Sequence, residues 1–143
     1  MRGLRLLYLF ASTVLLLATA CEVDREADHF ARSFIAHLRT GDSAGFALLE
    51  PRSEVSRAGW ARIAAMARSL PQDSLESIHL LESDRGVDEQ GAYTRLTYEL
   101  RSATERALVE LWLVNRDGRT FVNTVRIHPH ATYVPLPHLD AAV

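Results

Sequence analysis

Three hydrophobic patterns follow one another along the chain: an uninterrupted apolar run, a helical repeat and a strand repeat. Residues 6–17 carry no charge and follow a short positive start at Arg2 and Arg5. From about residue 24, apolar residues recur at spacings of three and four, which is the pattern of an amphipathic helix. From residue 75 they alternate with polar residues, which is the pattern of a half-buried strand. The order predicts a leader, then helices, then a β-sheet.

The helical part divides into three predicted helices. The first covers residues 24–39 and ends at Gly41, a residue suited to the left-handed conformation after a helix. A short second helix ends before Pro51, and a third covers residues 53–69. Their apolar faces consist of Val23, Ala27, Phe30, Ala31, Phe34, Ile35 and Leu38, then Phe46, Leu48 and Leu49, then Trp60, Ile63, Ala64, Ala67 and Leu70.

The strand repeat predicts four antiparallel strands. They centre on Ile78 and Leu80, on residues 94–100, on residues 107–114 and on residues 121–128. Four strands with one apolar face need helices to cover that face. We therefore expect an α+β domain over residues 24–130, in which N-terminal helices pack on a four-stranded antiparallel meander. Residues 131–143 contain further prolines and are predicted to form a C-terminal strap or tail.

Two turn signals set the expected strand registers. Asp117-Gly118 is a strong two-residue hairpin signal and pairs Arg116 with Arg119, whereas Ala103-Thr104 is weaker and pairs Ser102 with Glu105. Strand alternation then places two sets of residues on opposite faces. The face under the helices receives the predicted pocket-lining residues Tyr98, Thr124, Arg126 and His128. The other face receives Trp112, Phe121, Val125 and Ile127, to be covered by the strap or by a partner.

The order of elements, with a first helix ending in Gly41-Asp42 before a short Phe/Leu helix, resembles the nuclear transport factor 2-like superfamily over residues 24–128. The resemblance implies a cone-shaped, cystatin-like fold that often dimerises through its outer sheet face. Enzymes of the superfamily place an acid or base in the cone beside a tyrosine, and Tyr98, Arg126 and His128 are the nearest equivalents. The inward face of strands two to four carries no carboxylate, which favours binding over catalysis.

Composition excludes several classes of partner and site. The net charge of −2 argues against nucleic acid as a partner, and all sixteen basic residues are arginines. Cys21 is the single cysteine, which excludes an internal disulfide or a multi-cysteine metal site. His128-Pro129-His130, with His138 in reach, has the spacing of some metal sites. No carboxylate nearby completes a ligand set, so we predict neither a metal nor a cofactor.

The leader ends at Cys21. An apolar run of a dozen residues suits a signal peptide over residues 1–20 and falls short of the roughly 20 residues that span a bilayer. Ala18-Thr19-Ala20-Cys21 resembles a bacterial lipobox, which implies acylation of Cys21 and a short tether over residues 21–23. Secretory cleavage before Cys21 and an uncleaved anchor are the alternatives. Residue 22 is Glu rather than Asp, which in the sorting pattern of enterobacterial lipoproteins favours the outer membrane, facing the periplasm.

These features predict an envelope-anchored lipoprotein whose small domain binds a partner protein or a small apolar or anionic ligand. Removing the leader also removes Arg2 and Arg5 and takes the net charge from −2 to −4. A domain of that charge is not attracted to anionic lipid, so acyl chains would have to hold it at the membrane. The alternative is an enzyme of the isomerase, cyclase or dehydratase type that uses the cone as its active site.

Overall fold

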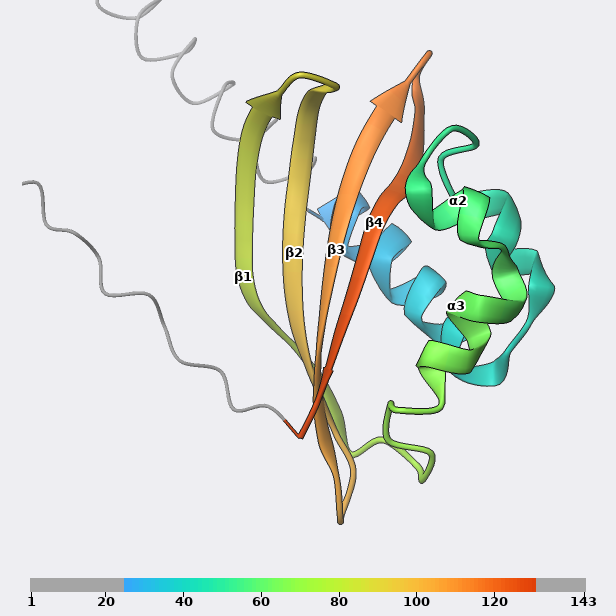
Figure 1. Cartoon of the computed structure of the whole chain (residues 1–143). Helices are drawn as coiled ribbons and strands as arrows, with labels where there is room; N and C mark the ends of the chain where they lie inside the picture. Colours follow the sequence, from blue (N-terminus) through green and yellow to red (C-terminus); the bar gives the residue numbers. More distant parts are fainter. Residues whose placement is uncertain (1–24, 131–143) are drawn as a thin grey trace, which may run out of the picture.

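The computed structural model describes residues 25–130, which fold as helices on one face of an antiparallel sheet (Figure 1). The helical elements are a long helix (residues 25–40), the 3-10 helix η1 (Ser43–Leu48), α2 (Glu54–Ala58) and α3 (Trp60–Ala67). The strands are β1 (Ser77–Asp88), β2 (Gly91–Arg101), β3 (Arg106–Arg116) and β4 (Arg119–Pro129). The predicted α+β class is confirmed. The predicted signal peptide, Cys21 and the strap lie outside the described residues. Within residues 25–130, no helix combines the length and the apolar character needed to cross a bilayer.

The sheet is a meander in which each strand pairs with its neighbour in sequence, in the order β1-β2-β3-β4. Both predicted turns are confirmed. Arg116 pairs with Arg119 across Asp117-Gly118. Ser102 N–H donates to Glu105 O at 2.9 Å across Ala103-Thr104. Short turns fix the register because they leave the strands no freedom to slide.

The core forms between the helices and one face of the sheet, as the hydrophobic pattern predicts. Phe34 from the long helix and Ile63 from α3 are buried in the same cluster as Leu111 at the centre of β3. Burying such a side chain contributes about 1.5–3 kcal/mol. The other buried members of the cluster are Ala31, Ile35, Leu38, Leu49, Ala67, Leu70, Leu96, Tyr98, Leu100, Ala107, Val109, Leu113, Val122 and Val125.

The predicted helix over residues 53–69 is wrong in one respect, because it is two helices. Ser53 caps α2 by accepting from Ser56 N–H, and the helix ends at Gly59, whose φ is 79°. This backbone conformation is open to glycine and strained for other residues. The break lets α2 and α3 lie along β4 in different directions, with α2 contacting the strand (Figure 1).

The predicted register of β3 and β4 holds only as far as Val122. Leu113 pairs with Val122, whereas Trp112 pairs with Thr124, so Asn123 is an extra residue in β4. Such a β-bulge moves every later side chain to the opposite face. Arg126 pairs with Glu110 and His128 with Leu108. The predicted placement of Thr124, Arg126 and His128 under the helices is therefore wrong, because all three lie on the outer face.

The same bulge corrects the predicted outer face. Val125 pairs with Leu111 and Ile127 with Val109, both of which belong to the helix-covered face. Val125 is buried on that face, and the partly buried side chain of Ile127 packs against the core. Only Trp112 and Phe121 keep the predicted outward position. The apolar outer surface is smaller than the sequence predicts.

Candidate functional site

Tyr98 is the one predicted pocket residue that lies under the helices, and its hydroxyl already has a partner. The hydroxyl donates to Asp28 Oδ1 at 2.8 Å, and Arg32 Nε donates to both oxygens of Asp28 at 2.9 Å. The Arg32 guanidinium lies 5.5 Å from the Tyr98 ring centroid and donates to Ile78 O at 3.0 Å. Burial, and then the hydrogen bond to Asp28, raise the pKa of Tyr98 far above its ordinary range.

This arrangement joins the long helix to the centre of the sheet. Asp28 and Arg32 are one helical turn apart, a spacing at which side chains meet. Asp28 pairs with Arg32, whereas Arg126 lies on the opposite face of the sheet and is not a partner of Asp28. We interpret Tyr98, Asp28 and Arg32 as a structural clamp, because the Tyr98 hydroxyl, both Asp28 oxygens and the Nε and Nη1 groups of Arg32 have protein partners.

On the outer face of the sheet, two arginine side chains lie over aromatic rings. The Arg126 guanidinium lies 4.8 Å from the Trp112 ring centroid, and that of Arg119 lies 5.3 Å from the Phe121 ring centroid. Guanidinium groups stack favourably on aromatic faces. His128 Nε2 lies 3.6 Å from Glu110 Oε1 beside them. These arginines shield part of the apolar outer surface. Whether the strap or a partner protein covers this surface, as the sequence predicts, is not tested by residues 25–130.

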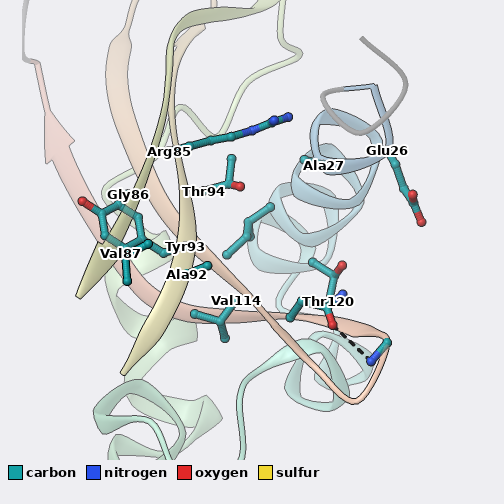
Figure 2. Close-up of a pocket in the computed structure, with 13 residues that line it drawn as sticks. Glu26, Ala27, Arg85, Gly86, Val87, Ala92, Tyr93, Thr94, Val114 and Thr120 are labelled. Atoms are coloured by element: carbon teal, nitrogen blue, oxygen red, sulfur yellow. Dashed lines mark hydrogen bonds between the residues drawn. The ribbon is translucent and has the colours of Figure 1, made fainter. Parts of the chain in front are cut away.

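A cavity of about 620 Å³ opens where the long helix begins, and we name it the mouth cavity (Figure 2). It lies at the end of the sheet that carries the turns between β1 and β2 and between β3 and β4. Each strand contributes lining residues from that end, and the first turn of the long helix closes the other side. The lining consists of Glu26, Ala27, Arg85, Gly86, Val87, Ala92, Tyr93, Thr94, Leu113, Val114, Asn115, Gly118 and Thr120.

The mouth cavity combines an apolar wall with polar groups at the strand ends. Arg85 extends from β1 toward the long helix, and the Thr94 hydroxyl lies beside it (Figure 2). Thr120 supplies a second hydroxyl from β4. Ala27, Ala92 and Leu113 supply apolar surface. Such a cavity can hold a molecule that has one polar end and one apolar part.

Two glycines shape this end of the sheet. Gly118 has a φ of 77°, and its N–H donates to Asn115 Oδ1 at 3.1 Å, which fixes the hairpin turn (Figure 2). Gly86 lies under the ring of Tyr93 on the opposite face, where an added Cβ would collide with the ring. Tyr93 thus packs flat on β1 and points away from the long helix (Figure 2).

None of the four predicted pocket residues lines the mouth cavity. Tyr98 belongs to the clamp, and the bulge moves Thr124, Arg126 and His128 to the outer face. Sequence reasoning missed Arg85 because the turn between β1 and β2 was not predicted. It missed Thr120 because the fourth strand was predicted to begin one residue later, at Phe121. Gly91, which follows the turn residues Glu89-Gln90 with a φ of 113°, was the available signal for the first turn, because glycine is common at turns.

The described residues offer no cluster of three or more histidine, cysteine, aspartate or glutamate side chains that could hold a metal ion. His128 and His130 are exposed at the end of β4, and His138 lies outside the described residues.

The chain matches no protein-family model, no curated protein and no solved structure.

Proposed function

We propose that this chain is a lipid-anchored bacterial envelope protein whose α+β domain binds a small anionic amphiphile in the mouth cavity without transforming it. The mouth cavity carries the proposal. Its volume of about 620 Å³ falls within the range of roughly 300–1,000 Å³ that small-molecule sites occupy.

Arg85 is the basic residue of the lining, and Glu26, the acidic one, extends away from the sheet (Figure 2). The positive charge of Arg85 favours a ligand that carries a carboxylate, sulfonate or phosphate at one end. The hydroxyls of Thr94 and Thr120 can add further hydrogen bonds from neighbouring strands. The apolar part of the ligand would pack against Ala27 and Leu113, where water is displaced from hydrocarbon surface.

The position of the cavity along the chain favours a ligand that comes from the membrane. Cys21, the predicted acylation site, precedes the lining residue Glu26 by five residues. Five residues span at most about 18 Å even when fully extended. An acylated Cys21 would therefore hold the mouth of the cavity close to the bilayer surface, where amphiphiles are concentrated.

We further propose that the fold is a nuclear transport factor 2-like cone. The order of helices before a four-stranded meander supports this assignment, as does a cavity at one end of the helix-covered face.

Metabolic labelling with a clickable palmitate analogue tests the anchor in a bacterial host that expresses the whole chain. We expect label on the wild type and none on Cys21→Ser, with the wild type in the outer-membrane fraction. An unlabelled wild-type protein would exclude the lipoprotein assignment.

Ligand binding is tested separately on the soluble Cys21→Ser chain from residue 21 onward, with decanoate as the probe. Ala27→Trp fills the mouth cavity and should abolish binding, whereas Ala36→Trp, on an exposed part of the same helix, should not. Arg85→Gln should weaken binding about tenfold, since the positive charge that faces the anionic end of the ligand is lost. Equal binding by all three variants would exclude the cavity as the site.

A further inference from the structure

A second hollow lies between β4 and the two short helices, and we name it the edge groove. This edge groove has a volume of about 310 Å³ and does not share a lining residue with the mouth cavity. Four consecutive residues of β4 line one side of it. The lining comprises Glu54, Val55 and Ala58 of α2, Arg62, Ile63 and Met66 of α3, and residues 124–127 of β4.

The backbone of β4 faces this groove, because β4 is the last strand of the sheet. His130 N–H donates to Arg106 O at 2.9 Å, so residue 130 turns its backbone groups toward β3. Backbone groups alternate in direction along an antiparallel strand. The N–H and C=O groups of Val125 and Ile127 therefore point away from β3. Among residues 25–130, none makes a backbone hydrogen bond to them.

At Val122, near the start of β4, the same edge already pairs with another segment of the chain, residues 49–50. Glu50 N–H donates to Val122 O at 2.8 Å, and Leu49 forms a parallel bridge with Val122. The chain then leaves the edge at Pro51 and enters α2. The edge groove begins at Thr124, two residues after Val122, where this segment no longer covers the edge of β4.

The groove has an apolar floor, and its charged lining residues are Glu54, Arg62 and Arg126, which leaves a net positive charge. Ile63 is buried at its base, and Met66 is 41% exposed above it. Arg62 and Arg126 are exposed at the rim. Residues 52–68 carry four arginines and one glutamate in a chain whose net charge is −2. This part of the surface is thus positive although the protein as a whole is acidic.

We propose that the edge groove binds an extended acidic peptide, which adds to β4 as a fifth strand. Backbone hydrogen bonds to Val125 and Ile127 would hold the peptide in register. Every second side chain of the peptide would point toward Ile63 and Met66, as strand alternation requires. Acidic side chains at its ends would meet Arg62 and Arg126. The proposal is independent of the mouth cavity.

The probe is a synthetic peptide of alternating valine and threonine with a glutamate at each end, titrated into the soluble Cys21→Ser chain. We expect the amide resonances of Val125 and Ile127 to shift on binding in NMR spectra. Replacing the terminal glutamates by lysines should weaken binding about tenfold, since two ion pairs are replaced by repulsion. Methylating every second backbone nitrogen should also weaken it about tenfold or more, because the strand hydrogen bonds are lost.

Paired variants on α3 and at its C-cap separate the groove from the rest of the helix. Met66→Glu and Arg62→Glu change the groove, whereas Ala65→Glu and Arg68→Glu make the same charge changes at exposed positions outside it. The first two should lose binding and the controls should retain it. Equal affinity for the N-methylated peptide would overturn strand addition.

Two other occupants are outcomes of the same experiment. If the peptide binds only after residues 131–143 are deleted, the groove belongs to the chain's own C-terminal segment and the partner peptide is excluded. If phosphatidylglycerol vesicles bind through the same residues and the peptide does not, the groove is a lipid-binding surface and the proposal fails.

Discussion

The hydroxyl of Tyr98 donates a hydrogen bond of 2.8 Å to a carboxylate oxygen of Asp28, seventy positions earlier in the chain. Arg32 holds the same carboxylate from the next turn of the helix. A fully buried tyrosine would otherwise leave its hydroxyl without a partner in the core, which costs about 1–3 kcal/mol. This contact therefore fixes where the long helix lies on the sheet.

Removing either end of this hydrogen bond should destabilise the domain to different degrees. Tyr98→Phe removes both the donor and its need for a partner, and we expect a loss of about 0.5–1.5 kcal/mol. Asp28→Ala leaves the buried hydroxyl unpaired and should cost about 1–3 kcal/mol. Urea unfolding of the single and double variants measures the coupling. Ser33→Ala, exposed on the same helix, is the control and should change little.

The raised pKa of Tyr98 predicts a loss of stability at high pH. The unfolded chain loses the tyrosine proton near pH 10, whereas the folded chain keeps it. The contribution of Tyr98 is thus complete below about pH 10 and declines as the pH rises above it. Unfolding midpoints measured between pH 8 and pH 11 should fall for the wild type. The fall should be shallower for Tyr98→Phe, and identical slopes would contradict the assignment.

Leu111 lies at the centre of the core and is fully buried. Leu111→Ala should cost about 2–5 kcal/mol, from the lost transfer free energy and the cavity left behind. Leu80→Ala is the matched control, because Leu80 is 38% exposed at the sheet edge. Chemical denaturation should show a small change for Leu80→Ala. Similar losses in both variants would mean that the core is centred elsewhere.

Gly59 separates α2 from α3 with a backbone conformation that disfavours a side chain. An added Cβ meets no atom within 4 Å, so the penalty is one of backbone strain alone. Gly59→Ala should therefore destabilise the domain by about 1–3 kcal/mol. If residues 53–69 formed one continuous helix, the same substitution would stabilise it by about 0.4–1 kcal/mol. Thermal unfolding distinguishes the two by sign.

Arg126 should shield Trp112 from solvent. In a Trp60→Phe background, Arg126→Ala should increase acrylamide quenching of Trp112 fluorescence, because the stacked guanidinium is removed. The stability loss should not exceed about 1 kcal/mol, as expected for an exposed cation–π pair. Arg119→Ala removes the corresponding arginine from Phe121 and should leave the quenching of Trp112 unchanged.

Apart from the break at Gly59, which divides the predicted helix over residues 53–69, the helices, the strands and two turns follow from the sequence because each rests on a local rule. Asp117-Gly118 and Ala103-Thr104 set their registers directly. The bulge at Asn123 was not predicted, although the sequence carries its signature. The inward apolar positions change from even at Val122 to odd at Val125 and Ile127, and only one inserted residue reconciles the two.

The mouth cavity could not be derived in the same way. It depends on the ends of all four strands meeting the first turn of a helix that is distant in sequence. Arg85 follows the bulge between Leu80 and Glu82, so its face depends on a second shift that no turn signal reports. Alternation along a strand predicts which residues share a face of the sheet. It does not predict where the helices stop covering that face and leave a cavity.

The meander has a consequence for how the domain folds. Every strand pairs with its neighbour in sequence, so the sheet can assemble by closing short loops, which is fast. The clamp between Asp28 and Tyr98 closes a loop of about seventy residues and forms against a higher entropic barrier. We therefore expect the hairpins to form before the long helix docks. Weakening the clamp would then act mainly by accelerating unfolding rather than by slowing folding.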